Sequence, residues 1–145
     1  MNCAIRYVKG NVSFGVKFRL TPSCELQGYS DSDWAGSLDD MRSTSGLCFN
    51  FGSGIFTWSS KKQEIVAQST AEAEFISATS VNHALWLRKI LTDLHLEQRT
   101  STKVMVDNQA AIAISNNPVF HDKTKHFSIK LFFTRDVHKD GAVRL

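Results

Sequence analysis

Acidic residues on three separate stretches of this chain have the spacing and surroundings of metal ligands. Asp31 and Asp33 follow a short alternation of apolar and polar residues, which is typical of a β-strand. Glu74 lies in Ser-Thr-Ala-Glu-Ala-Glu-Phe, and Asp107 ends Lys-Val-Met-Val-Asp. Carboxylate oxygens are the ligands that Mg²⁺ prefers in proteins, and several converging carboxylates are what magnesium-dependent hydrolysis of a phosphodiester requires. We therefore expect one acidic metal site, assembled from distant parts of the chain.

Size and composition are those of one globular domain. The chain has 145 residues, of which 42% are hydrophobic and 21% charged, and its net charge of +3 permits a polyanionic partner without demanding one. Cys3, Cys24 and Cys48 have no Cys-x-x-Cys spacing, so we expect reduced, buried cysteines rather than disulfides or a zinc site. We find no signal peptide and no apolar run of membrane-spanning length, and we expect an intracellular protein.

The first half of the chain favours strands. Residues 3–9 are consistent with the end of a helix that stops at Gly10, and Phe14, Val16 and Phe18 suggest a short strand after it. Beyond Pro22 comes the strand that carries Asp31. Two β-prone runs follow, 46–51 and 55–59, and the glycines between them predict a hairpin. Three antiparallel strands are thus expected first.

The second half favours helices. From Ser69 the apolar residues recur every three or four positions as far as Leu94, which predicts one amphipathic helix with a cap at Ser69 or Thr70. We then expect a strand, a short helix, a last helix or strand and a final strand, at the ranges 102–106, 108–115, 123–138 and 141–145. This order predicts an α/β fold with a mixed sheet and helices packed on it.

Both the order of the expected elements and the local sequence motifs resemble a known protein family. Seven blocks in succession are similar to motifs of the ribonuclease H domain of copia-type retrotransposon Pol polyproteins. They are Gly-Tyr-Ser-Asp-Ser-Asp-Trp-Ala-Gly (28–36), Arg-Ser-Thr-Ser-Gly (42–46), Trp-Ser-Ser-Lys-Lys-Gln (58–63), Ser-Thr-Ala-Glu-Ala-Glu-Phe (69–75), Ala-Leu-Trp-Leu-Arg-Lys-Ile-Leu (84–91), Asp-Asn-Gln-Ala-Ala-Ile (107–112) and Asn-Pro-Val-Phe-His-Asp-Lys-Thr-Lys-His (117–126). The resemblance covers most of residues 26–138 and implies a ribonuclease H-like fold.

The resemblance implies hydrolysis of the RNA strand of an RNA–DNA hybrid by an endonuclease that uses two Mg²⁺ ions, with Mn²⁺ as an alternative. Asp31, Glu74 and Asp107 match the family's catalytic metal ligands. Asp33 is interpreted as an accessory or turn residue. Glu74 is preferred to Glu72 because it precedes Phe-Ile-Ser-Ala, which is similar to the family's helix after its catalytic glutamate. Side chains two positions apart on a helix point about 200° away from each other, so only one of the two can face the metals.

Nucleic-acid contacts are expected near these carboxylates. They comprise polar and basic residues before the second strand, at the end of the third and after Asp107, namely Arg42, Ser43, Thr44, Lys61, Lys62, Asn108 and Gln109. His126 is a further accessory candidate. Trp34, Trp58 and Trp86 are expected to pack in the core rather than to stack on bases.

The resemblance also predicts a domain organisation. Residues 1–22 are similar to the connection from a reverse transcriptase, and residues 23–145 would form the ribonuclease H-like domain without its final helix. That helix carries a fourth carboxylate in the family. The expected partners are an RNA–DNA hybrid and the reverse transcriptase portion of a polyprotein, in the cytoplasm, a virus-like particle or the nucleus. The alternative is a catalytically impaired relic that keeps the fold and binds nucleic acid or a polymerase partner.

Overall fold

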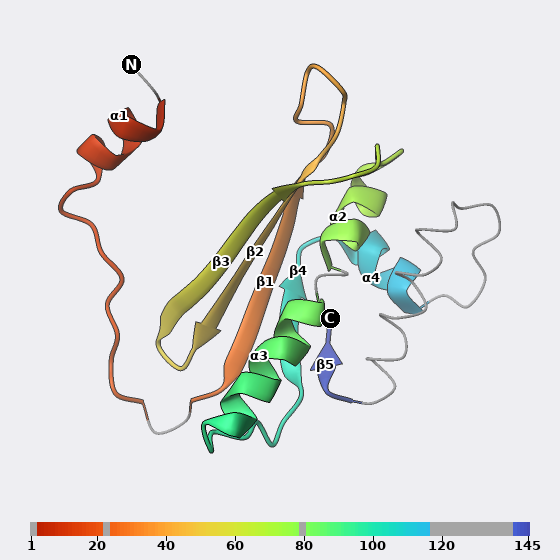
Figure 1. Cartoon of the computed structure of the whole chain (residues 1–145). Coiled ribbons are helices and arrows are strands. Elements are labelled where there is room, and N and C mark those ends of the chain that lie inside the picture. Colours follow the sequence, from red (N-terminus) through yellow and green to blue (C-terminus); the bar gives the residue numbers. More distant parts are fainter. Residues whose placement is uncertain (1–2, 22–23, 79–80, 117–140) are drawn as a thin grey trace.

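A mixed five-stranded sheet forms the centre of the molecule (Figure 1). The computed structural model describes residues 3–21, 24–78, 81–116 and 141–145. The strands β1 (Leu26–Asp33), β2 (Thr44–Phe51) and β3 (Gly54–Lys62) form an antiparallel meander. On the other side of β1, the strands β4 (Thr102–Val106) and β5 (Val143–Arg144) are parallel to it. The order across the sheet is β3-β2-β1-β4-β5, which confirms the predicted mixed sheet.

The hairpin between β2 and β3 lies where its glycines predict it. Gly52 has a φ of 61°, a left-handed conformation that costs glycine little and other residues more. A register shift between Phe49 and Asn50 marks a β-bulge beside this turn.

One face of the sheet carries the helices α2 (Thr70–Ala78), α3 (Val81–Asp93) and α4 (Gln109–Asn116). Two clusters of buried apolar side chains lie in this helical layer and its junction with the sheet. The first joins β1, β2, β4 and β5 to α3 and contains Leu26, Phe49, Ala84, Leu87, Leu91, Val104 and Val143. The second joins α2 to α4 and contains Ala67, Ala73, Phe75, Ile76 and Ala111.

Gly28 allows Phe49 and Val104 of the first cluster to pack against the backbone of β1. A Cβ atom at this position would lie 2.7 Å from Cε1 of Phe49 and 3.1 Å from Cγ2 of Val104. Because neither the ring nor the valine can retreat far in a packed core, glycine is required for this approach.

Arg88 fixes α3 to the segment that leads into β4. Its Nη1 donates to the carbonyl of Thr100 at 2.7 Å and to Oγ1 of Thr102 at 3.1 Å, and its Nη2 donates to the carbonyl of Gln98 at 2.7 Å. Burial lowers the pKa of this guanidinium from its ordinary value. The planar fork of arginine can satisfy these acceptors together, which a lysine ammonium cannot do with the same geometry.

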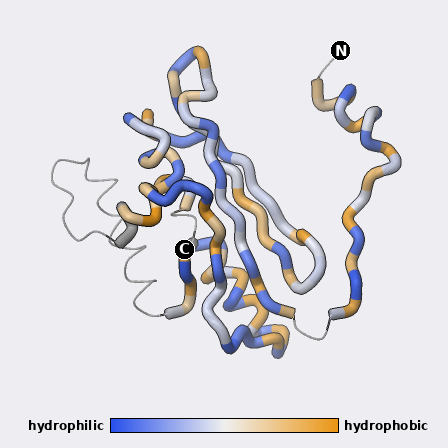
Figure 2. The backbone as a smooth tube through the Cα atoms, turned by 180° about the vertical axis from the view of Figure 1, so that it is seen from behind, coloured by the Kyte–Doolittle hydropathy of each residue, from blue (hydrophilic) through white to orange (hydrophobic). Residues whose placement is uncertain are grey.

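The N-terminal part lies apart from the sheet (Figure 2). The helix α1 (Cys3–Gly10) forms as predicted, but the residues around Phe14, Val16 and Phe18 do not form the predicted strand. Hydrophobic and hydrophilic residues do alternate there. The alternation is insufficient because a strand also needs a neighbour to pair with. The segment meets the sheet near the β2–β3 turn, where Ser53 Oγ accepts from the amide of Arg19 and donates to its carbonyl.

Several sequence-based expectations about burial are wrong. Trp34, Trp58 and Trp86 are exposed rather than packed in the core. Cys3 and Cys24 are free but exposed, and Cys48 is free and half-buried. The expected single helix from Ser69 to Leu94 is replaced by α2 and α3, and residues 79–80 between them lie outside the described part of the chain. The range 123–138 also lies outside it.

Candidate metal centre

The sheet topology brings Asp31 and Asp107 to the same edge. β1 and β4 are adjacent and parallel, and Ser30 is paired with Val106. Asp31 follows Ser30 and Asp107 follows Val106, so the two aspartates lie side by side, as expected near the carboxyl ends of neighbouring parallel strands. Glu74 is added from α2, which lies over β1.

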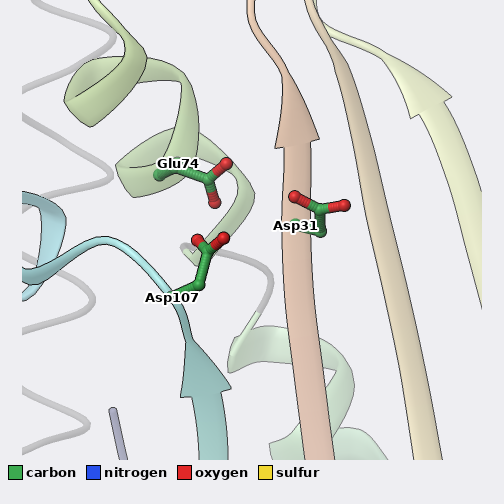
Figure 3. Close-up of side chains that lie close together, drawn as sticks. All are labelled: Asp31, Glu74 and Asp107. Carbon is green, nitrogen blue, oxygen red and sulfur yellow. The ribbon is translucent and has the colours of Figure 1, made fainter.

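The three carboxyl groups converge. One oxygen from each of Asp31, Glu74 and Asp107 can be chosen so that all three lie within 4.8 Å of one another. Figure 3 shows the carboxyl groups of Glu74 and Asp107 facing each other, with that of Asp31 beside them on β1. Asp31 and Asp107 are exposed, whereas Glu74 is only 6% exposed, so the cluster has a solvent-facing side and a buried side.

Glu72 and Glu74 have different tasks on α2. The hydroxyl of Ser69 accepts from the amide of Glu72 at 3.2 Å, and Oε2 of Glu72 accepts from the amide of Gln68 at 2.9 Å. This arrangement is a form of the capping box, in which the side chains satisfy amides at the helix start. Glu72 therefore stabilises the beginning of α2, and Glu74 faces the other two carboxylates.

One carboxylate oxygen of Glu74 has a hydrogen-bond partner, and the other has none. Its Oε1 accepts from the amide of Ser32 at 2.9 Å, whereas its Oε2 is buried and has no hydrogen-bond partner. Burial raises the pKa of Glu74, and the charges of Asp107 and Asp31 raise it further against the opposing effect of Ser32. A buried acceptor without a donor is costly in a folded protein.

This donor set fits a hard divalent cation. It offers three carboxylates and no thiolate or imidazole, which is the chemistry preferred by Mg²⁺, Ca²⁺ or Mn²⁺. A cation would also provide the unsatisfied Oε2 of Glu74 with a partner and offset the repulsion among the three charges. The cluster is thus a candidate centre for a divalent ion.

Sequence reasoning missed two serines that hold α2 beside this centre. Ser30 Oγ donates to Ser77 Oγ at 2.8 Å, and Ser77 Oγ donates to the carbonyl of Asp31 at 2.7 Å. The only signal in the sequence is Ser77 itself, a hydroxyl residue in the apolar stretch Phe-Ile-Ser-Ala that follows Glu74.

Basic candidates for nucleic-acid contact lie at the same end of the sheet as Asp31. Asp33, two positions after Asp31 on β1, is paired with Thr44 of β2, and Thr44 is paired with Lys62 of β3. Nζ of Lys62 lies 2.8 Å from a carboxylate oxygen of Asp40 and donates to Ser37 Oγ at 2.9 Å. The hydrogen bond from Lys62 is the main reason why the pKa of Asp40 is lowered to about 2.

The other basic candidates are also paired. Nε of Arg42 lies 3.6 Å from Asp40, and Nζ of Lys61 lies 3.6 Å from Glu64. Both pairs are exposed enough for solvent to screen them, so they contribute little stability.

Asp33 and Ser43 shape the loop between β1 and β2. The carboxylate of Asp33 accepts from the amide of Thr44 and lies outside the cluster of Asp31, Glu74 and Asp107. Ser43 is fully buried, and its hydroxyl accepts from the amide of Ala35 at 3.0 Å. The side chain of Ser43 is therefore inaccessible to a phosphate, and we remove it from the expected contacts.

Asn108 caps α4. Its Oδ1 accepts from the amides of Ala110 at 2.9 Å and Ala111 at 3.2 Å, which orients the helix directly after Asp107. Gln109, the first residue of α4, is exposed and follows Asp107 by two positions. His126 lies outside the described residues.

Comparison with known proteins finds some that are similar in sequence and a solved structure that is similar in fold. No family model matches the chain. It is 35% identical over 142 residues, 97% of its length, to the retrovirus-related Pol polyprotein from transposon TNT 1-94 of Nicotiana tabacum and, over the same share, to that from transposon RE2 of Arabidopsis thaliana. A crystal structure of LC11-RNase H1 in complex with an RNA/DNA hybrid superposes with a TM-score of 0.54 at 12% identity, covering 81% of this chain and 79% of that one. The chain is related to transposon Pol polyproteins and has the ribonuclease H fold.

The ribonuclease H fold confirms the fold that the seven motifs imply. The chain spans about a tenth of the length of the Pol polyproteins it matches. Among the described residues, we find no helix that is both long and apolar enough to cross a membrane.

Proposed function

We propose that this ribonuclease H-like domain hydrolyses the RNA strand of an RNA–DNA hybrid and uses two magnesium ions bound by Asp31, Glu74 and Asp107. The observation that supports the proposal most is the convergence of three carboxylates within 4.8 Å, one of them with a buried oxygen that has no hydrogen-bond partner. An exposed acidic cluster alone is common. A buried, unsatisfied carboxylate oxygen that belongs to such a cluster is not accounted for by folding stability.

Each residue has a role in this proposal. Asp31 and Asp107 would hold the cations from the exposed side of the cluster and Glu74 from its buried side, while the Ser32 amide fixes the orientation of the Glu74 carboxylate. When bound, the cations supply the positive charge that the developing charge on a phosphodiester requires. Asn108 caps α4 directly after Asp107.

Basic residues beside the centre would orient the hybrid. Lys62 and Arg42, both paired with Asp40, are within reach of a backbone that passes over the ends of β1, β2 and β3. Gln109 is exposed next to Asp107 and could bond to 2′-hydroxyls, by which RNA is distinguished from DNA. Lys61 and Thr44 remain candidates for phosphate contact.

Cleavage of a labelled hybrid by the full chain in magnesium tests the proposal. We expect cleavage of the RNA strand, no cleavage of matched RNA–RNA or DNA–DNA duplexes, and loss of activity in Asp31→Asn and in Asp107→Asn. Glu72→Gln is the matched control, because it changes a carboxylate of the same helix outside the cluster. Hybrid binding without cleavage would instead support the impaired relic, and cleavage that survives both Asp→Asn changes would contradict the assignment of the site.

The N-terminal segment suggests the polyprotein partner. We propose that residues 1–22 connect this domain to a reverse transcriptase portion that covers α1, since Ile5 and Val8 on this helix are 60% and 66% exposed. Co-purification with a separately produced reverse transcriptase portion tests this proposal. Ile5→Glu with Val8→Glu is expected to abolish the interaction, and retention of it would contradict the proposed contact.

A further inference from the structure

A buried chain of hydroxyl groups links α2 to β1 beside the acidic centre. Ser30 is 6% exposed and Ser77 is fully buried. Ser30 donates to Ser77, and Ser77 donates to the main-chain carbonyl of Asp31, so each hydroxyl hydrogen has one acceptor. The carbonyl of Gly46 on β2 lies 3.4 Å from Ser77 Oγ and is a second, more distant acceptor.

The placement of this chain couples two metal-site carboxylates. Ser77 follows Glu74 by three residues, so both side chains leave α2 on nearly the same side. Ser77 contacts β1 at Ser30 and Asp31, and Glu74 contacts it at the amide of Ser32. The carbonyl of Asp31 and the amide of Ser32 belong to one peptide group, so Ser77 and Glu74 both bond to the peptide that directly follows the Asp31 Cα.

Apolar packing alone does not fix this geometry as closely. Phe75 and Ile76 bury α2 against α4 and the core, but apolar contacts are not directional and tolerate small translations of a helix. Hydrogen bonds near 2.8 Å have a narrow range of distance and angle. The hydroxyl chain can therefore hold α2 at one position along β1.

We propose that Ser77 is a positioning residue that sets the separation of the Asp31 and Glu74 carboxylates through its bond to the Asp31 carbonyl. This inference rests on the proposed function insofar as the separation matters for metal binding. It does not require Ser77 to touch the metal or the substrate.

The test compares three variants of the full chain. Ser77→Ala removes the link, and Ser30→Ala combined with Ser77→Ala also removes the Ser30 hydroxyl that the single change leaves without an acceptor. Ile76→Val is the matched control, because it weakens packing at the neighbouring position of α2 without touching the hydroxyl chain. Magnesium affinity is measured by calorimetry, stability by urea unfolding, and attachment of Glu74 by hydrogen exchange of the Ser32 amide in metal-free protein.

We expect Ser77→Ala to weaken magnesium binding roughly tenfold, at the lower end of what is found for groups that orient metal ligands. The Ser32 amide should exchange faster than the loss of stability accounts for. The double variant should recover part of the stability, since no buried hydroxyl is orphaned, but none of the magnesium affinity. Ile76→Val should lose stability and keep its affinity.

Two results would overturn the positioning role. One is a double variant in which magnesium affinity recovers together with stability. The other is an equal loss of affinity in Ser77→Ala and Ile76→Val. If the unaltered chain binds no magnesium, the proposed function fails instead, and the exchange of the Ser32 amide alone then decides whether Ser77 positions Glu74.

Discussion

Glu74→Gln should stabilise the metal-free protein while abolishing its response to magnesium. Glutamine keeps an oxygen that can accept from the Ser32 amide, so the change removes the buried charge and little else. Two unit charges 4.8 Å apart repel by about 3.5 kcal/mol at an effective dielectric constant of about 20 and by about 0.9 kcal/mol in bulk water. Asp31 and Asp107 are exposed, so we expect a gain of about 1 to 2 kcal/mol, which corresponds to about 3 to 7 °C in Tm for a chain of this size.

The assay is thermal unfolding at neutral pH, first with a chelator and then with excess magnesium. The unaltered chain should gain Tm on addition of magnesium, since a ligand of the folded state stabilises it, and Glu74→Gln should not. Glu72→Gln is the control and should show the opposite pattern, because it weakens the cap of α2 and leaves the acidic centre intact. A lower Tm for Glu74→Gln in chelator would refute the reasoning.

The same comparison has a defined pH dependence. Burial raises the pKa of Glu74 in the folded state, so the folded chain binds a proton more tightly than the unfolded chain does. The contribution of Glu74 to the free energy of unfolding is fully present below the ordinary pKa of glutamate. It is lost as the pH rises through the higher pKa that Glu74 has in the folded state. The advantage of Glu74→Gln should therefore appear with rising pH and vanish in acid, and an advantage that is the same at every pH would contradict this cause.

Three further predictions concern side chains outside the acidic centre. In Lys62→Met, the pKa of Asp40, which is about 2 in the native protein, should rise toward the ordinary aspartate range in an NMR titration, and an unchanged value would mean that another group lowers it. The stabilising effect of this pair is present above the ordinary pKa of aspartate and is lost as the pH falls toward that low value. Gly28→Ala should destabilise the chain by about 1–3 kcal/mol in urea unfolding, because the added methyl collides with Phe49, and a neutral result would show that the ring can move. Arg88→Lys should cost about 1–3 kcal/mol in the same assay, because lysine cannot satisfy the acceptors of the guanidinium together, and a smaller loss would show that water replaces them.

The strand and cap signals of the sequence are local, which is why they predict much of the fold. The alternation before Asp31, the glycines of the β2–β3 turn and the serine that precedes α2 each act within a few residues, and the structure follows them. Helix geometry predicts that Glu72 and Glu74 face different surroundings, and in the structure they do, whereas the choice of Glu74 comes from the resemblance of the residues that follow it.

Exposure could not be predicted because it depends on where one element lies on another. The expected helical stripe through Trp86 assumes one continuous helix. With α2 and α3 as separate helices, the buried positions of α3 are Ala84, Leu87 and Leu91, and Trp86 is directed to solvent at 59% exposure. The hydroxyl chain from Ser30 to Ser77 depends in the same way on a contact between residues 47 positions apart.

The parallel pairing of β1 with β4 has a consequence for the order of folding during synthesis. The meander of β1, β2 and β3 consists of sequence neighbours and can form as soon as it leaves the ribosome. Asp107 follows β4, so any nascent chain that ends before this strand lacks one carboxylate of the centre, however well its hairpins have formed. Cation binding should therefore appear only after β4 and Asp107 have been synthesised and β4 has paired with β1. Cation binding would then report that this parallel pairing has formed.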